Sequence, residues 1–332
     1  MPRQPRLDAP ESLHHVMVRG LDRQRVFREE ADYANFLARV AALAEAGAWT
    51  VLAWALLPNH AHLLVRTGTR PLARNMRSLL TGYAGAFNRR HRRTGHLFQN
   101  RYKSVVVEAE AYQLELIRYL HLNPLRAGLV PTVTALARYP WTGHPALLGT
   151  RPQAWQATTE VWAAFGPTPR RAQAAYQTFV AAGVGQGRRL DLQGGGLVRS
   201  AGGWAAVAAL RRGREAYHSD ERVLGSSEFV EQLRRTAQRT AVRPRHRVTL
   251  EELLARVCRT VELPIAHLTG GARTPRVSRA RAGLAYLWVE VLGRPSRPLA
   301  AALGVQPAAI PKAARRGLQD AREWEQILGK ID

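Results

Sequence analysis

The residue types best suited to chemistry lie in two short stretches of the chain. His60 and His62 stand two positions apart in Leu57-Pro-Asn-His-Ala-His-Leu-Leu-Val65, which reads as a turn leading into a strand. Alternate residues of a strand face the same side, so both imidazoles lie on one face of a sheet. A pair of imidazoles there can hold a divalent metal ion. The plain alternative is two surface or core histidines that alternate by chance.

The second stretch is Ile117-Arg-Tyr-Leu-His-Leu-Asn-Pro124. Tyr119 and Asn123 are four residues apart, so in a helix they project from one face, one turn apart. Pro124 is predicted to end this helix directly after the asparagine. If the partner of this helix is the metal of the two histidines, Asn123 is the third ligand and Tyr119 lies one turn from the ion. His121 points away from that face and is a lesser candidate.

Such a set of groups suits attack on a DNA phosphodiester. In-line attack needs an oxygen nucleophile, a metal that polarises a phosphate oxygen, and cations along the flanking backbone. A tyrosine hydroxyl, with an ordinary pKa of about 10, is a weak nucleophile unless a metal offsets the developing charge. The phosphotyrosine link that it forms conserves bond energy for rejoining the strand.

The elements that must position these residues alternate in type. Apolar periodicity and turn residues predict the order strand, helix, strand, strand, helix, strand, followed by one more docked helix. This order is a split βαβ, ferredoxin-like pattern, so the fold class is α+β with an antiparallel sheet. The predicted ranges are strands at 14–19, 49–57, 60–65 and 103–107, and helices at 31–46, 71–91 and 110–122.

Composition beyond residue 148 predicts further helical parts. We divide the chain into a nuclease-like domain at 1–148, a helical linker region at 149–245 and an all-helical domain at 246–332. The middle region has a linker at 149–154, a helix at 155–182, a loop rich in glycine and arginine at 183–203, and a helix after residue 220 that Ser226 or Ser227 caps.

The last domain holds a segment that reads as helix, glycine turn, helix. Leu299-Ala-Ala-Ala-Leu-Gly-Val-Gln-Pro-Ala-Ala-Ile310 is followed by Lys312, Arg315 and Arg316, which together suggest a DNA-binding helix-turn-helix. Pro311 lies early in the second helix and is expected to strain it. A domain of packed helices without DNA binding is the alternative.

Charge and cysteine content narrow the function classes. The formal net charge of the 332 residues is +24, which attracts polyanions such as nucleic acid. The single cysteine, Cys258, excludes an intramolecular disulfide and a multi-cysteine zinc site. No apolar run is long enough to span a membrane and the first residues lack a signal-peptide core, so a cytoplasmic protein without a membrane partner is expected.

The charged side chains in the stretch of sequence around the histidine pair are all positive. Residues 46–107 contain no Asp or Glu, but they include nine arginines and Lys103. A solvated face normally mixes both signs, so this stretch suggests a groove for a phosphate backbone, although a generally basic protein would also show it. The cations that we predict to contact DNA are Arg19, Arg70, Arg74, Arg77, Arg89, Arg90, Arg92, Arg93, Arg101, Lys103, Arg126, Lys312, Arg315 and Arg316.

Several linked phrases resemble one known family. The phrases are His15-Val-Met-Val-Arg-Gly20, His60-Ala-His62, His96-Leu-Phe-Gln-Asn-Arg-Tyr-Lys-Ser104 and Tyr119-Leu-His-Leu-Asn-Pro-Leu-Arg-Ala-Gly-Leu129. In this order they resemble the single-tyrosine HUH transposases, and within these the REP-associated tyrosine transposases of bacteria. The likeness spans about Leu13 to Trp141. More loosely, the C-terminal region resembles the DNA-binding domain of the bacterial replication initiator.

The resemblance implies roles for particular residues. It makes Tyr119 the nucleophile, His60 and His62 metal ligands, and Asn123 the occupant of the third ligand position, where insertion-sequence relatives often have Gln. The implied cofactor is Mg²⁺ or Mn²⁺. The implied partner is single-stranded DNA beside small hairpins, cut to leave a 5′-phosphotyrosine, by a monomer or a homodimer.

Three functions are therefore in competition. The first is a DNA strand transferase that nicks and rejoins through Tyr119. The second is a repressor or hairpin-binding factor that has kept the fold without the reaction. The third is a metal-dependent RNA nuclease, which would form no covalent adduct. Detection of that adduct separates the first function from the other two.

Overall fold

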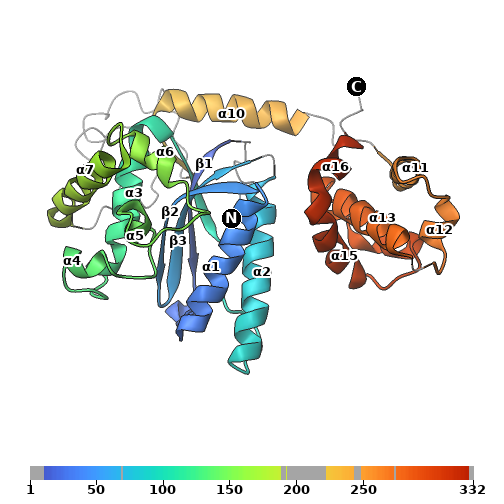
Figure 1. Ribbon diagram of the computed structural model, residues 1–332, viewed down its shortest axis with the longest axis horizontal. Coiled ribbons are helices and arrows are strands. Elements are labelled where there is room, and N and C mark those ends of the chain that lie inside the picture. The colour runs from blue at the N-terminus through green and yellow to red at the C-terminus, as the bar shows by residue number, and fades with distance from the viewer. Residues whose placement is uncertain are drawn as a thin grey trace, which may run out of the picture. The chain divides into compact units, whose positions relative to one another are not determined.

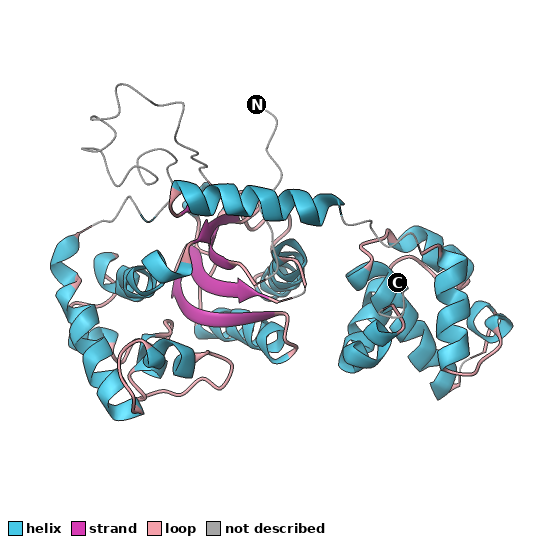
Figure 2. Cartoon of the chain, turned by 90° about the horizontal axis from the view of Figure 1, so that it is seen from above, coloured by secondary structure: helices cyan, strands magenta, loops and turns pink. Residues whose placement is uncertain are grey.

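The chain folds into two compact units, Met1–Thr240 and Ala241–Asp332. The structure is a computed structural model, and it describes residues 11–68, 70–187, 192, 222–242, 248–272 and 274–328 (Figure 1). The first unit combines a sheet with helices and the second is helical (Figure 2). This is the predicted α+β class followed by a helical C-terminal part.

A five-stranded sheet with the order β2-β3-β1-β4-β5 forms the centre of the first unit. The first four strands pair antiparallel, in the predicted ferredoxin-like arrangement, and β5 adds parallel to β4. The two-residue strand β5 was not predicted. The strands are β1 (Leu13–Arg19), β2 (Trp49–Leu57), β3 (His60–Thr67), β4 (Lys103–Val107) and β5 (Val223–Leu224).

Helices cover both faces of this sheet (Figure 1). On one face, α1 (Glu30–Glu45) and α2 (Leu72–Arg90) pack on one set of alternate strand residues, among them Val16, Leu63 and Val65. On the other face, α3 (Ala109–Arg126) packs on the opposite set, which includes Leu13 and Leu64. Neighbouring residues of β1 and β3 therefore belong to different cores, as the two-residue period of a strand requires.

The helix α3 is longer than predicted. Pro124 lies inside it, and the helix ends at Arg126, followed by Gly128 with a positive φ of 68°. A proline so close to the end removes only one backbone hydrogen bond, to the carbonyl four residues earlier. The Ala127 N–H still bonds to the Asn123 carbonyl, so the last turn persists until the left-handed glycine stops it.

Within the predicted middle region, the helix α7 (Pro169–Ala182) packs against α3. The predicted helix at 155–182 is two helices that break at Gly166-Pro167, where the chain cannot continue a regular helix. Most of the predicted glycine and arginine-rich loop at 183–203 lies outside the described residues. The elements directly after α3 are α4 (Val133–Leu136), α5 (His144–Leu147), α6 (Thr158–Ala163), α7 (Pro169–Ala182) and the short turn η2 (Val184–Gln186), of which α4 and α5 precede the predicted middle region.

The segment β5–α10 closes the β4 edge of the sheet. The helix α10 (Ser227–Val242) begins after Ser226, whose Oγ accepts the N–H of Phe229, as the sequence predicted for this cap. The Glu108 carboxylate accepts the backbone N–H of Ser226 at 2.8 Å and its hydroxyl at 3.1 Å. This contact ties the segment to the residue between β4 and α3.

The second unit has its own apolar core. Gly283 and Gly317 allow close helix packing, because a Cβ on either would lie within 2.3 Å of Trp324 or of the Ala282 carbonyl. Its elements are α11 (Leu250–Thr260), α12 (Ile265–Thr269), α13 (Pro275–Ala285), the π-helical turn η5 (Tyr286–Val291), α14 (Ser296–Ala302), α15 (Ala309–Gly317), η6 (Leu318–Asp320) and α16 (Ala321–Gln326).

The predicted helix-turn-helix segment corresponds to α14 and α15. Pro311 is the third residue of α15. N–H groups in the first turn have no carbonyl partner within the helix, so Pro311 removes no hydrogen bond there, and α15 continues to Gly317. Lys312, Arg315 and Arg316 are all exposed. Nowhere in the described parts of the chain does a helix have the length and apolar character needed to cross a membrane.

Candidate active site

The strands β1 and β3 bring three histidines to one face of the sheet. In their antiparallel register, Met17 lies opposite His62 and Arg19 lies opposite His60. Two residues before Met17 on the same face is His15, so its side chain stands diagonally next to His62. The predicted pairing of His60 and His62 on one face therefore holds, with ring centroids 5.1 Å apart, and β1 contributes a third imidazole.

The helix α3 lies over this face and brings Tyr119 to the histidines. The Tyr119 ring meets His15 and His62 edge-on, with centroid distances of 6.3 Å in both cases. Only 4% of Tyr119 is exposed. Asn123 follows one turn later and is also buried, and its Nδ2 has no hydrogen-bond partner among the described residues. Two stretches far apart in sequence thus meet within one chain.

Burial keeps the two predicted metal ligands neutral. It lowers the pKa of His60 to about 4, with a further contribution from the positive charge of Arg19. Burial also lowers the pKa of His62 well below its usual value, and the neighbouring His15, His60 and Arg19 add to this effect. At neutral pH both imidazoles therefore carry a nitrogen lone pair, the form in which histidine binds metals.

Hydrogen bonding fixes which nitrogen of His60 carries that lone pair. Its Nδ1 lies 2.6 Å from Oδ1 of Asn59, and the amide nitrogen of Asn59 donates to the Arg23 carbonyl at 3.2 Å. Because the amide oxygen can only accept, His60 must donate its Nδ1–H, and its Nε2 is left as the acceptor. The side chain of Asn59, in the turn before β3, thus sets the tautomer of His60.

His15 is the site residue that sequence reasoning missed. Its Nε2 lies 3.0 Å from Nδ1 of His62, and the two rings stack with centroids 5.3 Å apart. The two-residue period of the predicted strand at 14–19 puts His15, Met17 and Arg19 on one face. Nothing in the sequence showed that β1 would lie next to the histidine strand with that face on the same side.

Residues 10–123 match the family described as "Transposase IS200 like". Over this stretch the chain is similar to IS200-like transposases. This match confirms the family resemblance predicted from the sequence. The curated proteins contain no match to this chain.

Among solved structures, the chain is similar to one described as "Structure of the REP associates tyrosine transposase bound to a REP hairpin". The sequence identity is 14% and the TM-score is 0.38, over 47% of this chain and 90% of the other.

The predicted DNA-contacting cations of the IS200-like region fall at two ends of the sheet. Lys103 lies opposite Met17, in the same row across the sheet as His62, and Arg19 lies opposite His60. Arg70 and Arg74 instead follow the far end of β3. The helix α2 starts there and spans about 28 Å, at 1.5 Å per residue, before it returns to the histidine end. Arg19 and Lys103 are therefore the predicted cations nearest to the histidines by register.

Other predicted cations have defined partners within the fold. Arg90 bonds to Asp32 at 2.6 Å and to Glu29 at 3.3 Å. Arg93 lies over the Phe87 ring. Arg126 lies over the ring of Tyr119, with its guanidinium carbon 5.4 Å from the centroid. A cation at this position favours negative charge on the phenol. Four further predicted cations are exposed. Arg89, Arg92 and Arg101 lie near the loops at the end of the sheet that carries the histidines, and Arg77 lies near the start of α2.

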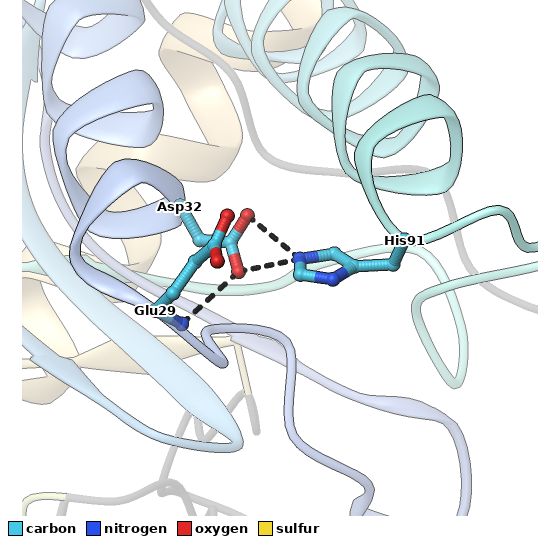
Figure 3. A group of neighbouring side chains, drawn as sticks. All are labelled: Glu29, Asp32 and His91. Atoms are coloured by element: carbon cyan, nitrogen blue, oxygen red, sulfur yellow. Dashed lines mark hydrogen bonds and ion pairs between the residues drawn. The ribbon is translucent and has the colours of Figure 1, made fainter.

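A second group of possible ligands lies on the opposite face of the sheet, between α1 and α2 (Figure 3). Ligand atoms of Glu29, Asp32 and His91 lie within 4.8 Å of one another. Burial alone would raise the pKa of Asp32, but hydrogen bonds from the Arg28 N–H, His91 and Arg90 lower it overall. Because Arg90 already supplies a positive charge to both carboxylates, this group serves to join the start of α1 to the end of α2.

The side of α3 that faces away from the sheet carries another buried polar group. The Tyr176 hydroxyl lies 2.7 Å from Nδ1 of His121 and 2.7 Å from Nδ1 of His144. All three side chains are buried. Burial lowers the pKa of His144 to about 4 and that of His121 well below its usual value. His121 therefore anchors α3 to α5 and α7, and the prediction that it points away from the Tyr119 face agrees with its placement.

Proposed function

We propose that this chain cleaves and rejoins single-stranded DNA beside hairpins, with Tyr119 as the nucleophile and a divalent metal held by His60, His62 and Asn123. The observation that supports it most is the edge-on packing of Tyr119 against His62 and His15, inside the IS200-like region. The choice of hairpin DNA follows from the family resemblance of the sequence phrases.

The residues present fit a metal of this kind. His60 and His62 are neutral imidazoles, and the contact with Asn59 leaves the lone pair of His60 on its Nε2. Asn123 adds an amide oxygen, a hard donor that suits Mg²⁺ or Mn²⁺. A bound ion would polarise a non-bridging oxygen of the scissile phosphate and offset charge in the transition state.

The reaction that we propose conserves the phosphoester. The Tyr119 Oη attacks phosphorus, an O–P bond forms to the tyrosine, and the bond from phosphorus to the 3′ oxygen breaks. The tyrosine loses its proton and the departing 3′ oxygen gains one, which leaves a 5′-phosphotyrosine and a free 3′-hydroxyl. Because no water enters, attack by a 3′-hydroxyl on the phosphotyrosine can restore the strand. Arg126 over the phenol ring would favour the charged form of the nucleophile.

One chain is enough to build this site. His62 and Tyr119 meet in the same chain, and both edges of the sheet carry other segments of that chain. At the β4 edge lies β5, and at the β2 edge Thr142 and Gln156 form bridges to Ala55 and Val51. We therefore expect the residues of the proposed site to come from one chain.

The burial of Tyr119 favours a second candidate function. With 4% of the residue exposed, Tyr119 offers little surface to a phosphate. A protein that binds hairpin DNA without opening this site would act as a regulatory factor. The covalent adduct again separates the two functions.

The test is a denaturing gel of the complete chain with end-labelled single-stranded DNA that carries hairpins from near its own gene. The proposal expects a labelled band shifted by the mass of the protein, dependent on Mg²⁺ or Mn²⁺ and abolished by a chelator. Tyr119→Phe should lose the band and still bind DNA. Tyr112→Phe is the matched control on the same helix and should keep it. Tight binding without a shifted band for wild type on any hairpin would favour the regulatory factor.

A further inference from the structure

The contact between His15 and His62 is at hydrogen-bond distance, and either partner could be the donor. Both partners are imidazoles, each able to donate or accept, and both are buried, with 0% and 6% of the residue exposed. The distance of 3.0 Å from Nε2 of His15 to Nδ1 of His62 is that of a hydrogen bond, and the planes of the rings differ by 25°. Such a bond needs one N–H and one lone pair.

The position of a single proton in this contact decides what His62 can do. If His62 donates its Nδ1–H, its Nε2 keeps a lone pair that can bind a cation. If His15 donates instead, the only proton of the neutral His62 is on Nε2, and that nitrogen can bind no cation. The Asn59 contact leaves no such choice for His60.

We propose that His15 is a positioning residue, which accepts the Nδ1–H of His62 and so holds the Nε2 lone pair of His62 ready for the divalent cation. This inference rests on the proposed function, because it assigns a role to the metal ligands named there. Metal-binding histidines usually donate their second N–H to a carboxylate, a carbonyl or a water. Here a neutral imidazole from the neighbouring strand takes that place, so the site gains no negative charge.

The neighbouring His14 provides a matched reference. It is on the same strand and is also fully buried, but it faces the core that α1 and α2 cover. Neither of its ring nitrogens has a hydrogen-bond partner among the described residues. A substitution there removes a buried imidazole from β1 without touching His62.

The first experiment measures Mn²⁺ binding to the complete chain without DNA, from the electron paramagnetic resonance signal of free Mn²⁺. His15→Phe keeps a ring but offers no acceptor, and it should weaken Mn²⁺ binding about 10–100-fold. His15→Gln restores an acceptor oxygen and should remain within about threefold of wild type, and His14→Phe should be unchanged. Equal affinity of His15→Phe and wild type would overturn the proposal.

Failure of the proposed function gives a different pattern. If His62→Ala binds Mn²⁺ as tightly as wild type, the histidine pair is no metal site, whatever His15 does. If His62→Ala loses binding and His15→Phe does not, the metal site stands and the role of His15 falls.

A second measurement needs no variant of His15 and covers the case in which such a variant does not fold. Nitrogen-15 spectra of labelled histidine in the metal-free wild-type chain distinguish the two neutral forms, and His62→Ala assigns the signal. The proposal expects His62 protonated at Nδ1. A proton on Nε2 would overturn it.

Discussion

Two clusters of one tyrosine and two histidines lie on opposite sides of α3, and they are connected differently. Toward the sheet, the ring of Tyr119 meets the edges of His15 and His62, and the two histidines bond to each other. Away from the sheet, the hydroxyl of Tyr176 stands between the Nδ1 atoms of two histidines, 2.7 Å from each. The residue types are the same, but the shared hydrogen bonds are not.

This difference decides which cluster suits chemistry. A hydroxyl has one proton, so Tyr176 donates to one imidazole and accepts from the other, and the two histidines must be opposite tautomers. In that cluster the hydroxyl oxygen and both Nδ1 atoms are occupied. In the Tyr119 cluster, the bond between the imidazoles leaves the second nitrogen of His62 facing outward from the pair. Similar composition therefore gives a structural anchor on one side and a candidate reaction centre on the other.

The largest expected effect comes from the same substitution in both clusters. Tyr119→Phe removes the only oxygen that we propose as nucleophile, and it should lower the rate of strand cleavage more than about a thousandfold. Tyr176→Phe removes a hydroxyl group from the cluster on the other side of α3 and should keep the cleavage rate within about tenfold of wild type. Single-turnover cleavage of a labelled hairpin substrate measures both rates. Comparable losses in the two variants would show that the clusters do not differ in function.

The same two substitutions should affect the free energy of unfolding in the opposite order. Tyr176→Phe leaves two buried imidazole nitrogens without their shared partner, which should lower the free energy of unfolding by roughly 1–3 kcal/mol. Tyr119→Phe removes a hydroxyl that the anchor does not use and should change it by less than about 1 kcal/mol. Urea unfolding of the two variants at neutral pH tests this. A larger loss in Tyr119→Phe would make that tyrosine the structural one.

The buried histidines also predict how stability depends on pH, and His14 serves as a reference because it lies in neither cluster. Burial lowers its pKa from 6.5 to about 4. Between these values the unfolded chain binds a proton that the folded chain does not, so stability falls as pH falls from about 6.5 to 4. His14→Phe should reduce this slope by up to about 1.4 kcal/mol per pH unit, measured by urea unfolding across the window. An unchanged slope would mean that His14 already carries its proton in the folded state.

Features that depend on the spacing of nearby residues could be predicted from the sequence. Features that depend on the pairing of distant strands and helices could not. The alternation around His60 and the helical spacing of Tyr119 and Asn123 are local, and the structure has the predicted strand and helix there. The contact of His15 with His62 depends on the register of two strands 47 positions apart, which no local pattern encodes. The same holds for Tyr176, whose partners come from two other helices.

The predicted ends of helices and strands were wrong where contacts with neighbouring residues overrode a rule based on one residue type. Pro124 was expected to end α3, but the Ala127 N–H still finds the Asn123 carbonyl, and the helix stops only before Gly128. Pro311 lies in the first turn of α15, where it removes no hydrogen bond of the helix. The strand β5 has two residues and no pattern of its own, because pairing with β4 alone makes it a strand.

The smallest expected effect concerns the cations, and it extends the comparison from the two sides of α3 to the two ends of the sheet. Arg19 and Lys103 are in the rows of His60 and His62, whereas Arg70 and Arg74 follow the far end of β3. Each phosphate contact to single-stranded DNA contributes about 0.7 to the slope of log affinity against log salt. The double variant Arg19→Gln with Lys103→Gln should therefore lower this slope by about 1.4. The double variant Arg70→Gln with Arg74→Gln should leave the slope unchanged. Fluorescence anisotropy between 50 and 300 mM salt, roughly the range in which such slopes are resolved, measures both. Because both pairs remove the same formal charge, a general effect of net charge would lower the slope equally in the two variants. A lower slope only in the Arg70 and Arg74 variant would place the phosphate path at the start of α2 instead.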